Sequence, residues 1–286
     1  MPGKIIVGIP GLWSTNLDVI VAVAQANEDI QNPRYLAAGP VIMDMQSKEG
    51  FGFDVYDHDP RLQHAFEVAG QGRLSSELLS RISNHTRTVY LVSRQQDVEA
   101  ARSMLRLATH LLDAGGLAVK VETSGVAHSA ERWRYFAAMN GLLSLHDAYV
   151  TLVGSNEFNY TCGMHNLALP DVSLTADIPK EAAPEYLVAF NQWNLLERPE
   201  LSDGAKFATS LSDPVFEMKH REYGYNLELE YNNPFGRWHL TVANDTAEKS
   251  ELITKRTEPL FMAFKSDDPE MIECVRKAQA SGALVP

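Results

Sequence analysis

The segment from Thr88 to Thr123 constrains the fold of this chain more than any other stretch. Thr88–Ser93 is a short apolar run typical of a buried strand. Asp97–Ala114 repeats apolar residues at helical spacing and ends at Gly115-Gly116, a common stop signal for a helix. Leu117–Thr123 is a second apolar run. A strand, a helix and a strand in this order predict neighbouring parallel strands in a helix-covered sheet.

The residues before this unit add further elements. Lys4–Ile9 predicts a first strand, which we expect Pro10-Gly11 to end. Tyr35–Met45 and Gly50–Tyr56 predict two more strands. Ser14 can cap a helix between the first two strands. The apolar residues of that helix recur at helical spacing: Leu17, Ile20, Val21 and Ala24.

The last part of the chain is richer in strand patterns than in helices. Ala148–Gly154, Val215–Tyr223, Leu227–Tyr231 and Trp238–Ala243 predict strands, and Asn232–Gly236 predicts a turn. A length of 286 residues suits two lobes of roughly 130–150 residues. We therefore predict an α+β fold with mixed β-sheets flanked by helices. Its two lobes would be an N-terminal α/β lobe, 1–155, and a C-terminal α+β lobe, 156–286.

Composition and charge exclude several classes of protein. The net charge is −12, whereas a nucleic-acid-binding protein needs a basic face. The acidic excess serves either solubility alone or the attraction of a basic protein partner. No apolar stretch approaches the ~20 residues of a membrane helix, and no apolar signal region precedes the first strand. The two cysteines, Cys162 and Cys274, form no disulfide framework, so we expect a cytoplasmic protein.

The segment Phe158–Asp171 contains the residues best suited to catalysis or metal binding. Cys162 and His165 have the chemistry of a thiolate–imidazole pair or of half a zinc site. Glu122 and His128 follow a predicted strand, where open α/β sheets bind ligands, and could line a pocket with that pair. Alternatively, His128 with Ser129 shapes the entry to a helix at 130–139, and Cys162 is a buried small hydrophobe. No metal or cofactor motif is present, so we predict neither.

Several short motifs recur together in a known family. They are G-I-P-G-L-W at 8–13, H-D-P-R at 58–61, V-K-V-E-T-S-G-V-A-H-S at 119–129, the 158–171 segment and F-N-Q-W-N-L at 190–195. Over about residues 4–210 the chain resembles a bacterial domain family of unknown function found among immunity proteins of polymorphic and type VI secreted toxins. It is also similar to the immunity partner of a type VI nuclease effector. That family has no established catalytic residues.

The resemblance implies a cytoplasmic immunity protein that binds a cognate secreted toxin and occludes its active site, the toxin being a basic nuclease effector. Acidic and aromatic side chains near the C-terminus are the predicted partner-binding residues: Glu228, Glu230, Asp267, Asp268, Glu270, Tyr225 and Tyr231. No nucleic acid or membrane is an expected partner. The alternative is a hydrolase-like enzyme with a pocket at Glu122, His128, Cys162 and His165. The missing catalytic motifs favour the non-enzymatic reading.

Overall fold

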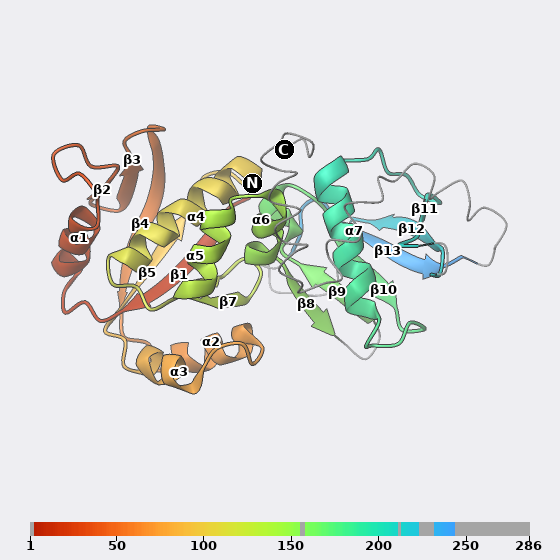
Figure 1. Cartoon of the computed structure of the whole chain (residues 1–286), viewed down its shortest axis with the longest axis horizontal. Coiled ribbons are helices and arrows are strands. Elements are labelled where there is room, and N and C mark those ends of the chain that lie inside the picture. The colour runs from red at the N-terminus through yellow and green to blue at the C-terminus, as the bar shows by residue number, and fades with distance from the viewer. Residues whose placement is uncertain (1–2, 155–157, 211–212, 223–231, 244–286) are drawn as a thin grey trace, which may run out of the picture. The chain divides into compact units, whose positions relative to one another are not determined.

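The computed structural model of the chain describes residues 3–154, 158–210, 213–222 and 232–243 (Figure 1). Within these residues the fold is α+β, as predicted, with helices packed on two β-sheets. The helices are α1 Asn16–Gln25, α2 Leu62–Gly70, α3 Ser76–Ser83, α4 Val98–Asp113, α5 Ala130–Met139, α6 Leu142–Tyr149 and α7 Ala183–Glu197, with a short 3-10 helix, η1, at Met164–Leu167.

The chain divides into two compact units. The first contains residues 1–199 and 220–239, and the second contains residues 200–219 and 240–286. Every candidate site described below lies within the first unit. The lobes 1–155 and 156–286 stay a prediction.

Seven strands form the first sheet, in the order β2-β3-β4-β5-β1-β6-β7. Each strand is antiparallel to its neighbours. The strands are β1 Ile6–Gly11, β2 Tyr35–Ala38, β3 Val41–Asp44, β4 Glu49–Asp57, β5 Arg87–Val92, β6 Ala118–Val121 and β7 Val126–Ser129. The predicted single strand Tyr35–Met45 is thus a hairpin. Its turn is Gly39-Pro40, and Gly39 has a φ of +59°, which glycine adopts without steric cost.

The prediction of neighbouring parallel strands is wrong. β5 and β6, the strands on either side of α4, are separated by β1, which is antiparallel to both. β1 is buried along nearly all its length, and such a strand fits a central position. It also continues through Pro10 and Gly11. Their carbonyl oxygens accept hydrogen bonds from the Leu117 and Thr86 backbone N–H groups, at 2.8 and 2.9 Å, and proline lacks only the donor.

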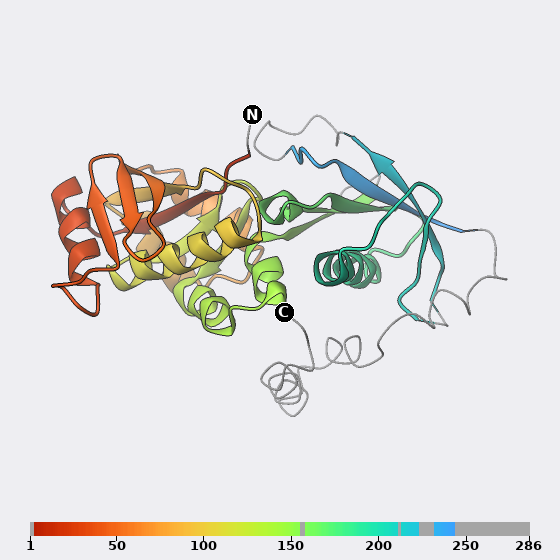
Figure 2. The same ribbon diagram turned by 90° about the horizontal axis from the view of Figure 1, so that it is seen from above.

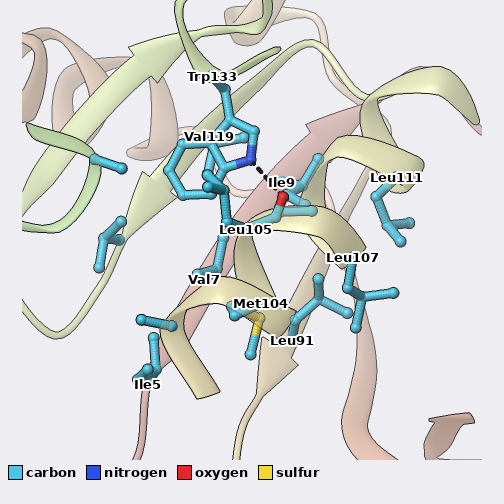
Figure 3. Packing of buried hydrophobic residues seen from close by; sticks show 14 of the residues in the cluster. Ile5, Val7, Ile9, Leu91, Met104, Leu105, Leu107, Leu111, Val119 and Trp133 are labelled. Carbon is cyan, nitrogen blue, oxygen red and sulfur yellow. Dashed lines mark hydrogen bonds between the residues drawn. The ribbon is translucent and has the colours of Figure 1, made fainter. Parts of the chain in front are cut away.

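One face of this sheet carries the main hydrophobic core. α4 and α5 lie across it, as both views show (Figures 1 and 2). Alternate residues of the central strands, including Val7, Ile9 and Val119, meet the apolar side of α4 there (Figure 3). Trp133 of α5 is fully buried, and its indole N–H donates to the Leu105 carbonyl at 3.1 Å. α4 begins after Asp97 and ends before Gly115, as the sequence predicts.

The opposite face is covered at one end by α2 and α3. A smaller apolar cluster lies there, in which Phe66 and Ile82 pack against Ala118 and Ala127 of β6 and β7. β6 and β7 are therefore buried on both faces. Gln71 caps the C-terminus of α2, and its amide donates to the Thr151 hydroxyl and the Leu152 carbonyl, both at 3.1 Å.

The second sheet follows the order β11-β12-β13-β10-β9-β8. Its strands are β8 Thr151–Gly154, β9 Phe158–Cys162, β10 Asp171–Thr175, β11 Lys206–Phe207, β12 Phe216–Arg221 and β13 Arg237–Val242. α7 packs against β9 and β10. The strand predicted at Ala148–Gly154 begins later than expected, because α6 extends to Tyr149.

Candidate functional site

Cys162 and His165 stand at the two ends of a sharp turn. β9 ends at Cys162, and η1 begins at Met164. Gly163 between them has a φ of +127°, a conformation that L side chains rarely adopt. A Cβ built there would lie 2.1 Å from the Tyr149 carbonyl oxygen, so the turn requires glycine for its conformation and for its space.

The Cys162 and His165 side chains are buried, and this burial decides how reactive they are. Cys162 is 5% exposed, and burial, with the charge of Asp171 as a lesser cause, raises the pKa of its thiol well above the ordinary value. His165 is 1% exposed, and neither ring nitrogen has a hydrogen-bond partner among the described residues. The thiol and the imidazole are thus not hydrogen-bonded to each other. This arrangement does not generate the thiolate that a nucleophile requires.

Asp171, at the other end of the same segment, is the centre of its hydrogen bonds. One carboxylate oxygen accepts from the Met164 backbone N–H at 3.0 Å, and the other accepts from the Asn233 side-chain amide at 2.7 Å. The Asn233 amide also donates to the Leu169 carbonyl at 2.9 Å. Asp171 is 5% exposed, and His165 Nδ1 lies 3.9 Å from its carboxylate. The carboxylate therefore holds the turn in place.

Glu122 directly follows β6 of the first sheet, whereas Cys162 ends β9 of the second. Its carboxylate forms an ion pair with Lys120, and both side chains are largely buried. A Cβ on Gly8 would come 2.8 Å from a Glu122 oxygen, so the glycine leaves room for the carboxylate. Burial and, to a lesser extent, the charge of Glu122 raise the pKa of Tyr90 to about 12. Glu122 is thus part of a packed polar cluster.

His128 lines a pocket of about 500 Å³. Its ring packs against Trp133 and Phe136, and its Nε2–H donates to the Ala148 carbonyl at 3.1 Å. Burial lowers the pKa of His128 to about 4, so the ring is neutral at physiological pH. The next residue, Ser129, caps α5 by accepting from the Arg132 backbone N–H at 3.2 Å, as the alternative reading predicted.

Of the four predicted catalytic residues, His128 alone is among the residues that line this pocket. Glu122, Cys162 and His165 do not line the pocket at His128. The predicted partner-binding residues fall outside the described residues: Tyr225, Glu228, Glu230, Tyr231, Asp267, Asp268 and Glu270. In the described ranges, no three His, Cys, Asp or Glu side chains gather closely enough to hold a metal ion. Among the same residues, no helix has the length and apolar character needed to cross a bilayer.

A surface that the sequence reading did not single out lies on α1. The helix is capped by Thr15 rather than Ser14, through a reciprocal pair of hydrogen bonds with Asp18. Val19 and Val23 face the core. Leu17 and Val21 are therefore left on the outside, 66% and 43% exposed.

The apolar exposure continues beyond α1. Ile30, in the loop that leaves the helix, is 69% exposed, and Leu36 on β2 is 38% exposed. β2 is the edge strand of the seven-stranded sheet, and α1 packs beside it (Figures 1 and 2). We call Leu17, Val21, Ile30 and Leu36 the α1 surface. Val21 lies two residues from each of the buried valines, Val19 and Val23, and this spacing is the signal for two apolar faces on one short helix.

Comparison of the chain with protein-family models, curated proteins and solved structures finds no match.

Proposed function

We propose that this protein is a cytoplasmic immunity protein that binds a basic protein toxin, of the nuclease effector class, and occludes its active site. The resemblance to toxin immunity proteins supplies the biological setting. The observation that carries the binding function is the α1 surface, because four large apolar side chains stand in solvent on one helix, one loop and the adjoining edge strand. Exposed apolar groups of this kind mark interaction sites.

The charge around the α1 surface selects the partner. Residues 12–31 contain Asp18, Glu28 and Asp29 and no lysine or arginine. Residues 1–72 as a whole have nine acidic residues against four basic ones. An apolar surface with acids and no bases along residues 12–31 fits a partner that presents an apolar contact within a basic rim, as the nucleic-acid groove of a nuclease does.

The mechanism follows from this pairing of apolar and acidic groups. The acids attract the basic toxin over a distance set by salt, with a Debye length of ~8 Å at physiological ionic strength. Leu17 and Val21, one helical turn apart, then anchor the complex by losing their contact with water. A protein seated over the groove excludes the nucleic-acid substrate without any chemical step.

The test is a complex with the cognate toxin, which is to be sought among the neighbouring genes. Co-expression should give a stable complex and protect the cell. Leu17→Ser with Val21→Ser should weaken binding by at least about tenfold, since central anchors dominate interface energy. Val68→Ser is the matched control, because Val68 is 62% exposed on α2, outside the α1 surface. If no complex forms and toxicity is unchanged, the function is refuted. If the double variant binds like wild type, the α1 surface is not the contact.

A further inference from the structure

The pocket at His128 has a chemistry that toxin binding does not use. It is formed where the loop after α2, the β7–α5 junction and the end of α6 meet. Two arginines, Arg73 and Arg132, line it together with His128, His146 and Asp147. Its volume, about 500 Å³, is within the usual range for small-molecule sites.

The two guanidinium groups are charged and are not neutralised by ion pairs. Arg73 donates to the Gly70 carbonyl at 3.1 Å and to the Gln71 side-chain oxygen at 3.4 Å, and both acceptors are neutral. Arg132 lies over the Phe136 ring, 4.6 Å from its centroid. Neither arginine forms an ion pair with a carboxylate of the described residues. Burial and, to a lesser extent, the nearby Arg132 charge lower the pKa of Arg73, whereas the Asp147 charge raises it; a bound anion would add to the effect of Asp147.

A second, independent observation comes from His146. This residue is 4% exposed, and its Nδ1–H donates to the Asp147 carboxylate at 3.0 Å. His146 lines the pocket, and its Nε2 is buried without a hydrogen-bond partner among the described residues. A buried polar atom without a partner is costly, and a ligand hydroxyl that displaced the atoms covering Nε2 would satisfy it. The neutral His128 ring, whose Nε2–H is already bonded, leaves its Nδ1 as a further acceptor.

The N-terminus of α5 contributes a smaller attraction. Ser129 is its cap and lines the pocket, and the helix dipole there favours negative charge. Glu131, in the first turn, already accepts from Ser129 and from its own backbone N–H, so part of this attraction is used. The arginines therefore supply most of the anion selectivity.

We propose that this pocket binds a small phosphate monoester that carries free hydroxyl groups, such as a sugar phosphate. Two guanidinium groups suit the several oxygens of a phosphoryl group, to which arginine donates in pairs. The two histidine acceptors suit hydroxyl donors on the remainder of the ligand. This inference is independent of the α1 surface, which lies on other elements of the fold.

Titration calorimetry of the full chain tests the proposal with glucose 6-phosphate, inorganic phosphate and citrate as probes. Glucose 6-phosphate should bind, and inorganic phosphate should bind at least about threefold more weakly because it leaves the histidines unpaired. Arg73→Gln and Arg132→Gln should each weaken glucose 6-phosphate binding by about tenfold or more, because a hydrogen bond to a charged group is lost.

Arg134→Gln is the matched control, because Arg134 is on α5, as Arg132 is, and pairs with Asp113 outside the pocket. Circular dichroism and melting temperature establish that each variant is folded. A variant that does not fold is replaced by Arg→Lys at the same position, which keeps the charge and removes the paired donors. The proposal is overturned if neither phosphate probe binds, if citrate binds more tightly than both, or if the arginine variants bind like the control.

Discussion

The side-chain amide of Asn27 hydrogen-bonds both backbone groups of Tyr35. Its Oδ1 accepts from the Tyr35 N–H at 2.9 Å, and its Nδ2 donates to the Tyr35 carbonyl at 3.0 Å. The same Nδ2 donates to the carbonyls of Val23 and Ala24 at the end of α1. One buried asparagine thus connects α1 to the edge strand β2 and holds together the elements that present the α1 surface.

Asn27→Ala should lower the free energy of unfolding by about 2–3 kcal/mol, because the buried Tyr35 backbone loses its partners. Urea denaturation measures this difference. Asn32→Ala is the control, since the Asn32 side chain makes one exposed hydrogen bond, to Asp29, and should change stability little. Equal stability of the two variants would contradict the role given to Asn27.

Gly163→Ala should lower the free energy of unfolding by more than about 3 kcal/mol or prevent folding, because the new Cβ meets the Tyr149 carbonyl and the backbone is strained. The Gly72→Ala variant is the control that separates the cost of backbone strain from the cost of a steric clash. Gly72 also has a positive φ, of +76°, but a Cβ there has nothing within 4 Å. It should cost about 1 kcal/mol. Chemical denaturation of both variants decides the matter, and a Gly163→Ala protein as stable as Gly72→Ala would refute the argument.

His128 should make the fold less stable in mild acid. Its pKa is about 4 in the folded protein against 6.5 ordinarily, so below pH 6.5 the unfolded chain binds a proton that the folded chain does not. The contribution of the neutral His128 ring to the free energy of unfolding is therefore complete above pH 6.5 and is lost as pH falls toward 4. The loss is about 2 kcal/mol at pH 5.

Urea unfolding at pH 5, 6 and 7 measures that loss. His128→Gln should reduce the decrease in stability between pH 7 and pH 5 by about 2 kcal/mol, since glutamine does not titrate. The exposed His64, replaced by Gln, is the control. A His128→Gln protein that loses as much stability as wild type over this range would contradict the buried neutral ring.

Cys162 should not react with thiol reagents in the folded protein. A Cys274→Ser background leaves Cys162 as the one thiol. Because burial suppresses its thiolate, its reaction with Ellman's reagent should be at least about a hundredfold slower than in guanidinium chloride. Rapid, stoichiometric labelling of the native protein would reopen the nucleophile reading of Cys162.

The sequence predicted correctly the elements whose signals, such as helical spacing and capping residues, lie within one short stretch of the chain. α4 is recognisable because its helical spacing and the glycines after Asp113 lie within one stretch, and Ser129 is recognisable as the cap of α5 for the same reason. The central place of β1 is not, because its partners, Val89 and Lys120, are about 80 and 110 residues away in sequence.

The pocket shows the same limit. His128 could be selected from its position after a predicted strand, but Arg73 and His146 come from other elements and meet it only in the folded chain. The helical spacing places Leu17 and Val21 among the apolar positions of α1, although Val19 and Val23 are the ones that face the core. An apolar residue on a short helix indicates a contact, but the sequence does not say whether that contact is internal.

The central position of β1 has a consequence for synthesis of the protein. β1 is complete at Gly11, but its second partner, β6, begins at Ala118. At ~5–20 residues per second, the ribosome leaves this apolar strand incompletely paired for roughly 5–20 s. A chain that ends before β6 cannot bury β1 on both edges. The N-terminal third of the protein should therefore not fold as a separate fragment, and we expect nascent chains of that length to bind chaperones.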